Sequence, residues 1–124
     1  MVASPESIRN TVETYIKAVA TGTADDVLAL YAEGATLEDP VGSTVRTTRE
    51  SIREFYAVLE QLEREAELVT LRIASDTAAF NFRLTTKMGD QTLELAPIDV
   101  MEFDDDGKIV SMRAVWGPED MITG

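Results

Sequence analysis

Apolar residues recur at helical spacing through the first half of the chain. A capping serine, a proline and an acid begin the first pattern at Ser4, and this pattern predicts a helix over residues 4–22. Apolar residues at helical spacing over residues 23–34 predict a second, shorter helix. The capping-box sequence at residues 47–50 begins a third helix with its own apolar stripe.

The apolar period changes from helical to alternating after about residue 65. A short strand over residues 35–39 precedes this region, which itself contains four strands: Leu68–Ser75, Thr77–Met88, Leu93–Phe103 and Ile109–Trp116. Turns of the Gly and Asp type connect them as hairpins. Helices followed by an antiparallel meander indicate an α+β fold, with N-terminal helices packed on one face of a curved, mainly antiparallel sheet. We expect residues 1–124 to form one domain.

The strand predicted over residues 93–103 carries a carboxyl group in an apolar row. Side chains alternate along a strand, so Asp99 shares its face with Leu95, Met101 and Phe103. Burial among such neighbours raises the pKa of a carboxyl group and favours the neutral acid. A neutral acid can donate a hydrogen bond to a negatively charged oxygen.

Composition restricts the chemistry mainly through what the chain lacks. No cysteine or histidine is present, which excludes disulfides, thiol nucleophiles, serine–histidine pairs and the usual zinc ligands. No acidic cluster has calcium-loop spacing, and the run Asp104–Asp106 beside Gly107 is typical of a hairpin turn. A net charge of −12 argues against binding to nucleic acid or anionic membranes. Without a long apolar run or a signal sequence, we expect a cytoplasmic protein.

Proton chemistry in this chain must therefore use Asp, Glu, Tyr or Lys. Asp39 ends a short strand beside Pro40, a place that suits either a general base or a turn residue. The three tyrosines, Tyr15, Tyr31 and Tyr56, all fall on predicted helices among apolar residues, where each alone is typical of a core residue. Together, a neutral acid, a chain of phenols and a second carboxylate suggest an oxyanion hole with a base. That set suits proton abstraction next to a carbonyl group.

Apolar residues lie on both faces of the predicted sheet. On the inner face some of them can line a pocket, although most will belong to the core: Phe55, Phe80, Phe82, Leu95, Met101, Phe103, Met112 and Trp116. The other face carries Ala96, Ile98 and Val100 on one strand and Ile109 and Val115 on the next. Because three helices cover only one face, we predict a homodimer that buries part of the other.

Five segments, in order along the chain, carry a resemblance to a known family: Glu13–Ile16, Glu38–Ser43, Ile52–Tyr56, Ala96–Asp99 and Val110–Gly117. The Asp-Pro-Val-Gly-Ser and Ala-Pro-Ile-Asp sequences are the most specific of them. Through these segments the chain resembles bacterial ketosteroid isomerase, within the superfamily of cone-shaped, NTF2-like α+β folds. That family is itself the well-known example of a carboxylic acid kept neutral by an apolar site.

The resemblance implies a homodimeric isomerase that needs no cofactor and acts on a 3-oxo-Δ5 steroid. Asp39 is then the base that moves a proton from the carbon beside the 3-oxo group to a carbon further along the ring system. Tyr15 and protonated Asp99 are the two donors to the dienolate oxygen, and Tyr31 and Tyr56 support Tyr15. The pocket walls implied are Phe82, Met101, Phe103, Met112 and Trp116.

Two kinds of alternative remain open from the sequence. One is a different reaction on the same fold, such as that of a polyketide-type cyclase, a dehydratase or an epoxide hydrolase. These enzymes often use histidine or an Asp-Arg-Asp set, and the chain has no histidine. The other is a dimer that only binds a hydrophobic ligand. That alternative explains a pocket but not a carboxyl group placed mid-strand inside it.

Overall fold

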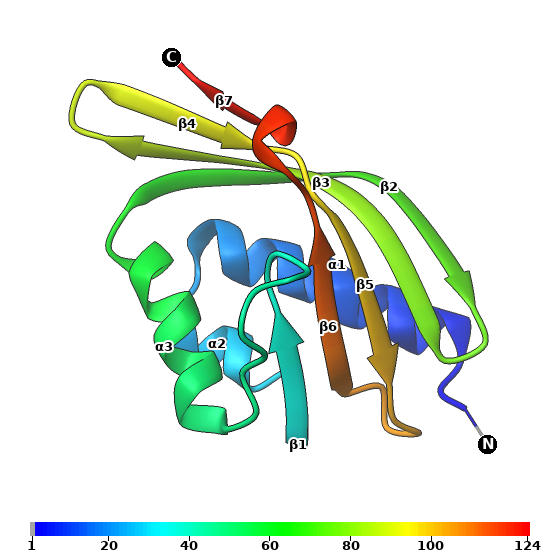
Figure 1. The fold of residues 1–124 in the computed structure, drawn as a ribbon. Coiled ribbons are helices and arrows are strands. Elements are labelled where there is room, and N and C mark those ends of the chain that lie inside the picture. The colour runs from blue at the N-terminus through cyan, green and yellow to red at the C-terminus, as the bar shows by residue number, and fades with distance from the viewer. Residues whose placement is uncertain (1) are drawn as a thin grey trace.

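The computed structural model describes residues 2–124 and places three α-helices beneath a curved seven-stranded sheet (Figure 1). The helices are α1 (Pro5–Thr21), α2 (Ala24–Leu28) and α3 (Arg49–Glu60). The strands are β1 (Tyr31–Glu38), β2 (Glu63–Ala74), β3 (Thr77–Met88), β4 (Gln91–Leu95), β5 (Ile98–Phe103), β6 (Ile109–Val115) and β7 (Met121–Thr123). The predicted α+β arrangement of helices and mostly antiparallel sheet is confirmed.

Side-chain caps begin α1 and α2 where the sequence predicts, and α3 one residue after the predicted capping box. The Ser4 hydroxyl accepts the Ser7 backbone N–H at 3.1 Å at the start of α1, and Thr48 caps α3 in the same way through Ser51. Gly22 is the C-cap of α1, and the position suits glycine because a Cβ there would lie 3.0 Å from the backbone of Ala18.

The long strand β3 is the centre of the sheet. Its whole length pairs with β2 on one edge, while β4 and β5 share the other edge end to end. The sheet continues from β5 through β6 to β1, which pairs with β6 in parallel, and β7 pairs with β4 at the other end. In Figure 1 the β3–β4 hairpin therefore projects beyond the helices.

The second helix is shorter than predicted, and Tyr31 lies on a strand instead of a helix. The α-helix ends at Leu28, and the carbonyl of Leu30 accepts the N–H of Ile109 at 2.9 Å. Pairing with the sheet thus overrides the helical spacing of the apolar residues, and Tyr31 becomes the first residue of β1.

The strand predicted over residues 93–103 is interrupted at Ala96 and Pro97. Proline has no N–H to give to a ladder, and the Ala96 N–H donates to Asp120 at 3.0 Å instead. A second irregularity lies in β6, where Val110 is an extra residue opposite β5. This bulge turns Ile109 into the core with Met112, whereas the sequence pattern placed Ile109 on the outer face.

The core lies between the helices and the concave inner face of the sheet. Its fully buried side chains include Ile8, Val12, Leu37, Ile52 and Phe80. On the outer face Ile98 and Val115 lie directly opposite each other on β5 and β6 and are 48% and 52% exposed. None of the helices within residues 2–124 is long and apolar enough to cross a membrane.

Candidate functional site

A cavity of about 450 Å³ is lined by residues of α3 and of the β3–β4 hairpin, among others. Most of its wall is apolar, and the hairpin contributes Leu84, Met88, Leu93 and Leu95. The polar side chains on the wall include Tyr15, Asp39 and Tyr56. An apolar cavity with a few convergent polar groups is typical of a small-molecule site.

Three buried tyrosines form a hydrogen-bonded chain, and two of them, Tyr15 and Tyr56, line the cavity. Tyr15 on α1 and Tyr56 on α3 have their hydroxyl oxygens 3.0 Å apart, and Tyr56 and Tyr31 on β1 are 2.6 Å apart. Each phenol is no more than 3% exposed, and burial raises the pKa of all three well above the usual value for tyrosine. The three hydrogen-bonded tyrosines are therefore neutral phenols, each able to donate one hydrogen bond.

Asp99 is buried at mid-strand, as the alternation of β5 predicts. It is 1% exposed and pairs across the sheet with Phe80, whose ring contacts Tyr15 edge-on at a centroid distance of 6.1 Å. Burial raises the pKa of Asp99 well above its usual value, and the nearby Asp39 carboxyl adds to this effect. Both Asp99 carboxyl oxygens are buried without a hydrogen-bond partner within residues 2–124.

Asp39 lies at the end of β1, on the wall of the cavity. It is only half-buried, and its Oδ1 accepts a hydrogen bond from the indole N–H of Trp116 at 2.8 Å. Burial raises the pKa of Asp39 above the usual value, while the bond from Trp116 acts in the opposite direction because it stabilises the carboxylate. The two aspartates thus differ in environment: Asp99 is driven strongly towards the neutral acid, and Asp39 keeps a donor for its charged form.

The structure gathers most, but not all, of the residues singled out from the sequence. Tyr15, Asp39, Tyr56, Phe82 and Trp116 line the cavity. Tyr31 is connected to it through Tyr56. Asp99 is buried and is not among the residues that line the cavity.

Three of the expected wall residues lie elsewhere. Met101, Phe103 and Met112 are at most 4% exposed and belong to the core instead of the cavity wall. They occupy the inner face of β5 and β6 on the other side of Asp99 from the hairpin, so the sheet carries them away from the cavity. They are not wall residues of this cavity, and their contact with a substrate stays a prediction.

Sequence reasoning missed two features of the site. It gave Trp116 only the role of a wall, whereas its N–H also bonds Asp39. From α3 and the hairpin it named only Phe55 and Leu95 as candidates for the wall, and it missed Leu59, Leu84 and Leu93. The apolar stripe of α3 was visible in the sequence, but the residues of a stripe that face a cavity look the same as those that face a core.

Comparison with known proteins places the chain in a family. A model of the SnoaL-like domain matches residues 12–112. A steroid delta-isomerase from Nocardioides simplex is 48% identical over 115 residues, covering 93% of this chain and 94% of that protein. The chain belongs to the SnoaL-like family, in its steroid delta-isomerase group. This membership confirms the resemblance found in the five segments.

Two solved structures share the fold of this SnoaL-like chain. SalBIII, described as an epoxide hydrolase/cyclase-like enzyme with a role in pyran ring formation in polyether salinomycin, is 28% identical, with a TM-score of 0.86 over 94% of this chain and 95% of its own. RV0760c from Mycobacterium tuberculosis is 19% identical, with a TM-score of 0.87 over 98% and 99% of the two chains. The second likeness concerns the fold alone.

Proposed function

We propose that the chain isomerises a 3-oxo-Δ5 steroid to the conjugated Δ4 ketone without a cofactor. The Asp39 carboxylate removes a proton from C4, and the electrons of that C–H bond pass to the C3 oxygen to give a dienolate. Protonated Asp39 then returns the proton to C6, so that the double bond moves from C5–C6 to C4–C5. No atom is gained or lost, and the base is regenerated.

The observation that carries this proposal is the pair of unpartnered carboxyl oxygens on buried Asp99. A buried polar group without a hydrogen bond costs about 1–3 kcal/mol, and a ligand that bonds Asp99 would remove this cost. A neutral Asp99 has a proton to donate, and a steroid oxyanion beside Tyr15 would accept it. Tyr15 on the cavity wall supplies the second donor.

The tyrosine chain supports this assignment. When the Tyr15 proton points to the ligand, Tyr56 donates to the Tyr15 oxygen and Tyr31 donates to Tyr56, which agrees with the two distances of 3.0 and 2.6 Å. Such a chain polarises its terminal donor and strengthens the bond to the developing charge.

The test is an ultraviolet assay with a β,γ-unsaturated 3-oxo steroid, in which the conjugated product is followed by its absorbance. We expect the wild type to catalyse formation of the enone. In Asp39→Asn the rate should fall by about 10²- to 10⁴-fold, the range for a removed general base. Asp105→Asn, on an exposed hairpin turn, is the matched control and should keep full activity. Binding of the steroid without turnover in the wild type would refute the proposal.

A cyclisation or epoxide-opening reaction is the second candidate, favoured by the likeness to SalBIII at 28% identity. It also uses carboxyl groups in a hydrophobic cavity. Turnover of a polyether-type epoxide, with none of the steroid, would decide for it.

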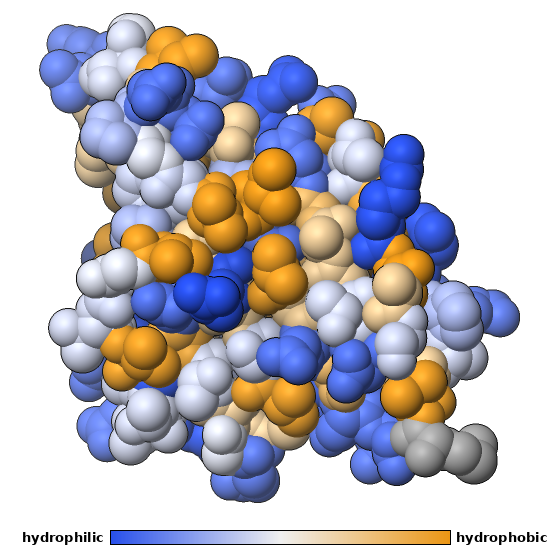
Figure 2. Space-filling model, turned by 45° about the vertical axis from the view of Figure 1, so that its right-hand side comes forward, coloured by the Kyte–Doolittle hydropathy of each residue, from blue (hydrophilic) through white to orange (hydrophobic). Residues whose placement is uncertain are grey.

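We also propose that the outer face of the sheet forms a homodimer. The exposed pair Ile98 and Val115 supports this, and Figure 2 shows apolar side chains grouped near the middle of one face of the molecule. Sedimentation should give a dimer at micromolar concentration, and Val115→Lys should convert it to a monomer. A monomeric wild type would rule out this assembly.

A further inference from the structure

The short segment that carries Asp39 leaves the sheet and is held by a small set of hydrogen bonds, among them those from the Ser43 N–H and hydroxyl to the carbonyl of Pro40. Upstream, β1 ends at Glu38, which pairs with Arg113 in the parallel ladder of β1 and β6. Downstream, the chain leaves the sheet through Pro40, and the next backbone bond to the sheet is from the Val41 N–H to Ala114 at 2.9 Å. The base therefore lies in a loop and not within a strand.

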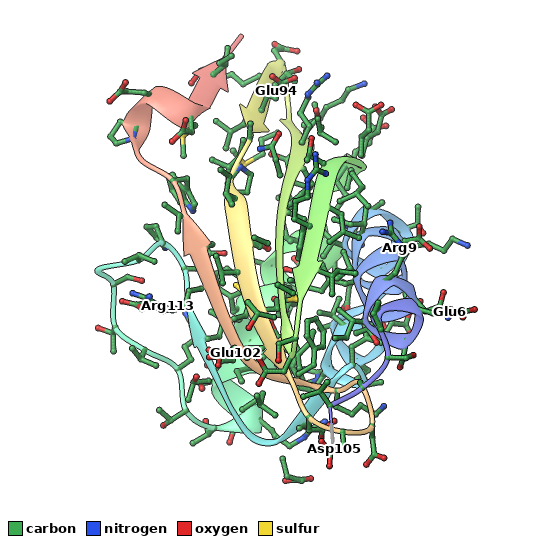
Figure 3. All side chains as sticks on the ribbon, turned by 90° about the vertical axis from the view of Figure 1, so that its right-hand side faces the viewer. Glu6, Arg9, Glu94, Glu102, Asp105 and Arg113 are labelled. Carbon is green, nitrogen blue, oxygen red and sulfur yellow. The ribbon has the colours of Figure 1, made fainter. Side chains whose placement is uncertain are left out.

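The side chain of Glu38 closes this loop from the outer side of the sheet. Its Oε2 accepts the backbone N–H of Gly42 at 2.9 Å, and its Oε1 accepts the guanidinium N–H of Arg113 at 3.0 Å. Figure 3 shows Arg113 on β6, beside the loop that follows β1. The Glu38 side chain is only 17% exposed although it forms an ion pair near the surface.

Both bonds of Glu38 favour its charged form, so the carboxylate is a stable anchor. The N–H of Gly42 and the Arg113 guanidinium together hold the pKa of Glu38 below its usual value. Because the same side chain spans from the last residue of β1 to a residue past Pro40, it brackets Asp39 on both sides. The Trp116 indole bonds the Asp39 carboxyl group itself from the inner side.

We propose that Glu38 is a positioning residue for the base, acting through the loop 39–42. The inference rests on the proposed isomerisation, in which Asp39 must reach two ring carbons in turn. Misplacement of a reacting group by about 1 Å can cost about 10²-fold in rate. Loss of the Glu38 bracket would let Asp39 move while the tyrosine chain and Asp99 stay in place, because these groups lie on α1, α3, β1 and β5.

The experiment compares Glu38→Ala, Glu38→Gln and Glu102→Ala with the wild type in the enone assay. Glu102 is an exposed glutamate on the outer side of β5 and is the matched control. Binding of oestradiol, whose phenol imitates the dienolate oxygen, is measured in parallel. Sedimentation checks that all four proteins are compared in the same assembly state.

We expect Glu38→Ala to lower kcat by about 10- to 100-fold, with KM and the oestradiol Kd within about twofold of wild type, because a lost positioning contact affects the moving base more than bound ligand. Glu38→Gln keeps an oxygen for the Gly42 N–H and should regain most of the lost kcat. An unchanged kcat in Glu38→Ala would overturn the inference. Weaker oestradiol binding in Glu38→Ala, in proportion to the fall in kcat, would also overturn the inference, because it would show that the whole site is disturbed. Absence of turnover in the wild type would instead refute the proposed function.

Discussion

Trp116→Phe should move the acid limb of the pH–rate profile to higher pH. The wild-type indole N–H donates to Asp39 Oδ1 at 2.8 Å, and phenylalanine keeps an aromatic wall but has no donor. The bond stabilises the carboxylate more than the neutral acid, so its loss raises the pKa of Asp39 beyond the rise that burial already causes. Since only the ionised base is active, turnover falls off at a higher pH in the variant.

The size of the shift follows from the strength of one bond to a charged group. Such bonds contribute about 1.5–3 kcal/mol, and Asp39 is half-buried, so water replaces part of the loss. We take the lower end, and because one pKa unit corresponds to about 1.4 kcal/mol, we expect a shift of about one pH unit.

The assay is the pH dependence of kcat/KM for the β,γ-unsaturated steroid, which reports the free enzyme's base. Phe55→Leu is the control, because it alters a cavity-wall ring that makes no bond to Asp39 and should leave the limb in place. If the acid limb of the kcat/KM profile in Trp116→Phe lies at the same pH as in the wild type, or at lower pH, then either Asp39 is not the base or the bond from Trp116 does not stabilise its carboxylate.

Three further outcomes follow from the same geometry. Tyr15→Phe and Asp99→Leu should each lower kcat by about a hundredfold or more, as for a lost oxyanion donor, and a near-normal kcat in both would contradict the oxyanion hole. Tyr56→Phe leaves the hydroxyls of Tyr15 and Tyr31 without their shared partner, so urea unfolding should show a loss of about 1–3 kcal/mol, with Tyr31→Phe losing less because it removes an end of the chain. The pKa of Asp99 is higher in the folded than in the unfolded protein, so the folded protein binds more protons, and its stability falls as pH rises from about 4 towards the folded-state pKa. Asp99→Asn should remove this fall in stability. A stability difference between Asp99→Asn and wild type that does not grow with pH in this window would contradict the raised pKa of Asp99.

The sequence was sufficient for features that depend on local pattern. Alternation along β5 placed Asp99 on the buried face, and the cap at Ser4 gave the start of α1. The capping-box sequence at residues 47–50 came within one residue of the observed cap of α3, Thr48. Both depend only on residues within a few positions of each other. They are therefore available without knowledge of the three-dimensional arrangement.

Features that depend on distant partners were not available. Tyr31 was expected on a helix because residues 23–34 do not reveal that the start of β1 pairs with β6. The strand β7 was missed because its pairing with β4 joins segments far apart in the chain. The bond from Trp116 to Asp39 and the bond from Glu38 to Gly42 likewise need the positions of separate elements.

Two strands, β4 and β5, share one edge of β3, so the proposed catalytic groups and the wall that contacts the ligand lie on different parts of the sheet. The half of β3 paired with β5 lies beside Asp99, whereas the half paired with β4 supplies wall residues such as Leu84 and Thr86. If Asp39 and Asp99 act as proposed, mutations in the hairpin should change the length and shape of the accepted molecule and leave these two groups unchanged. This separation offers an evolutionary reason why one cone-shaped scaffold serves proteins as different as a steroid delta-isomerase and a cyclase-like enzyme.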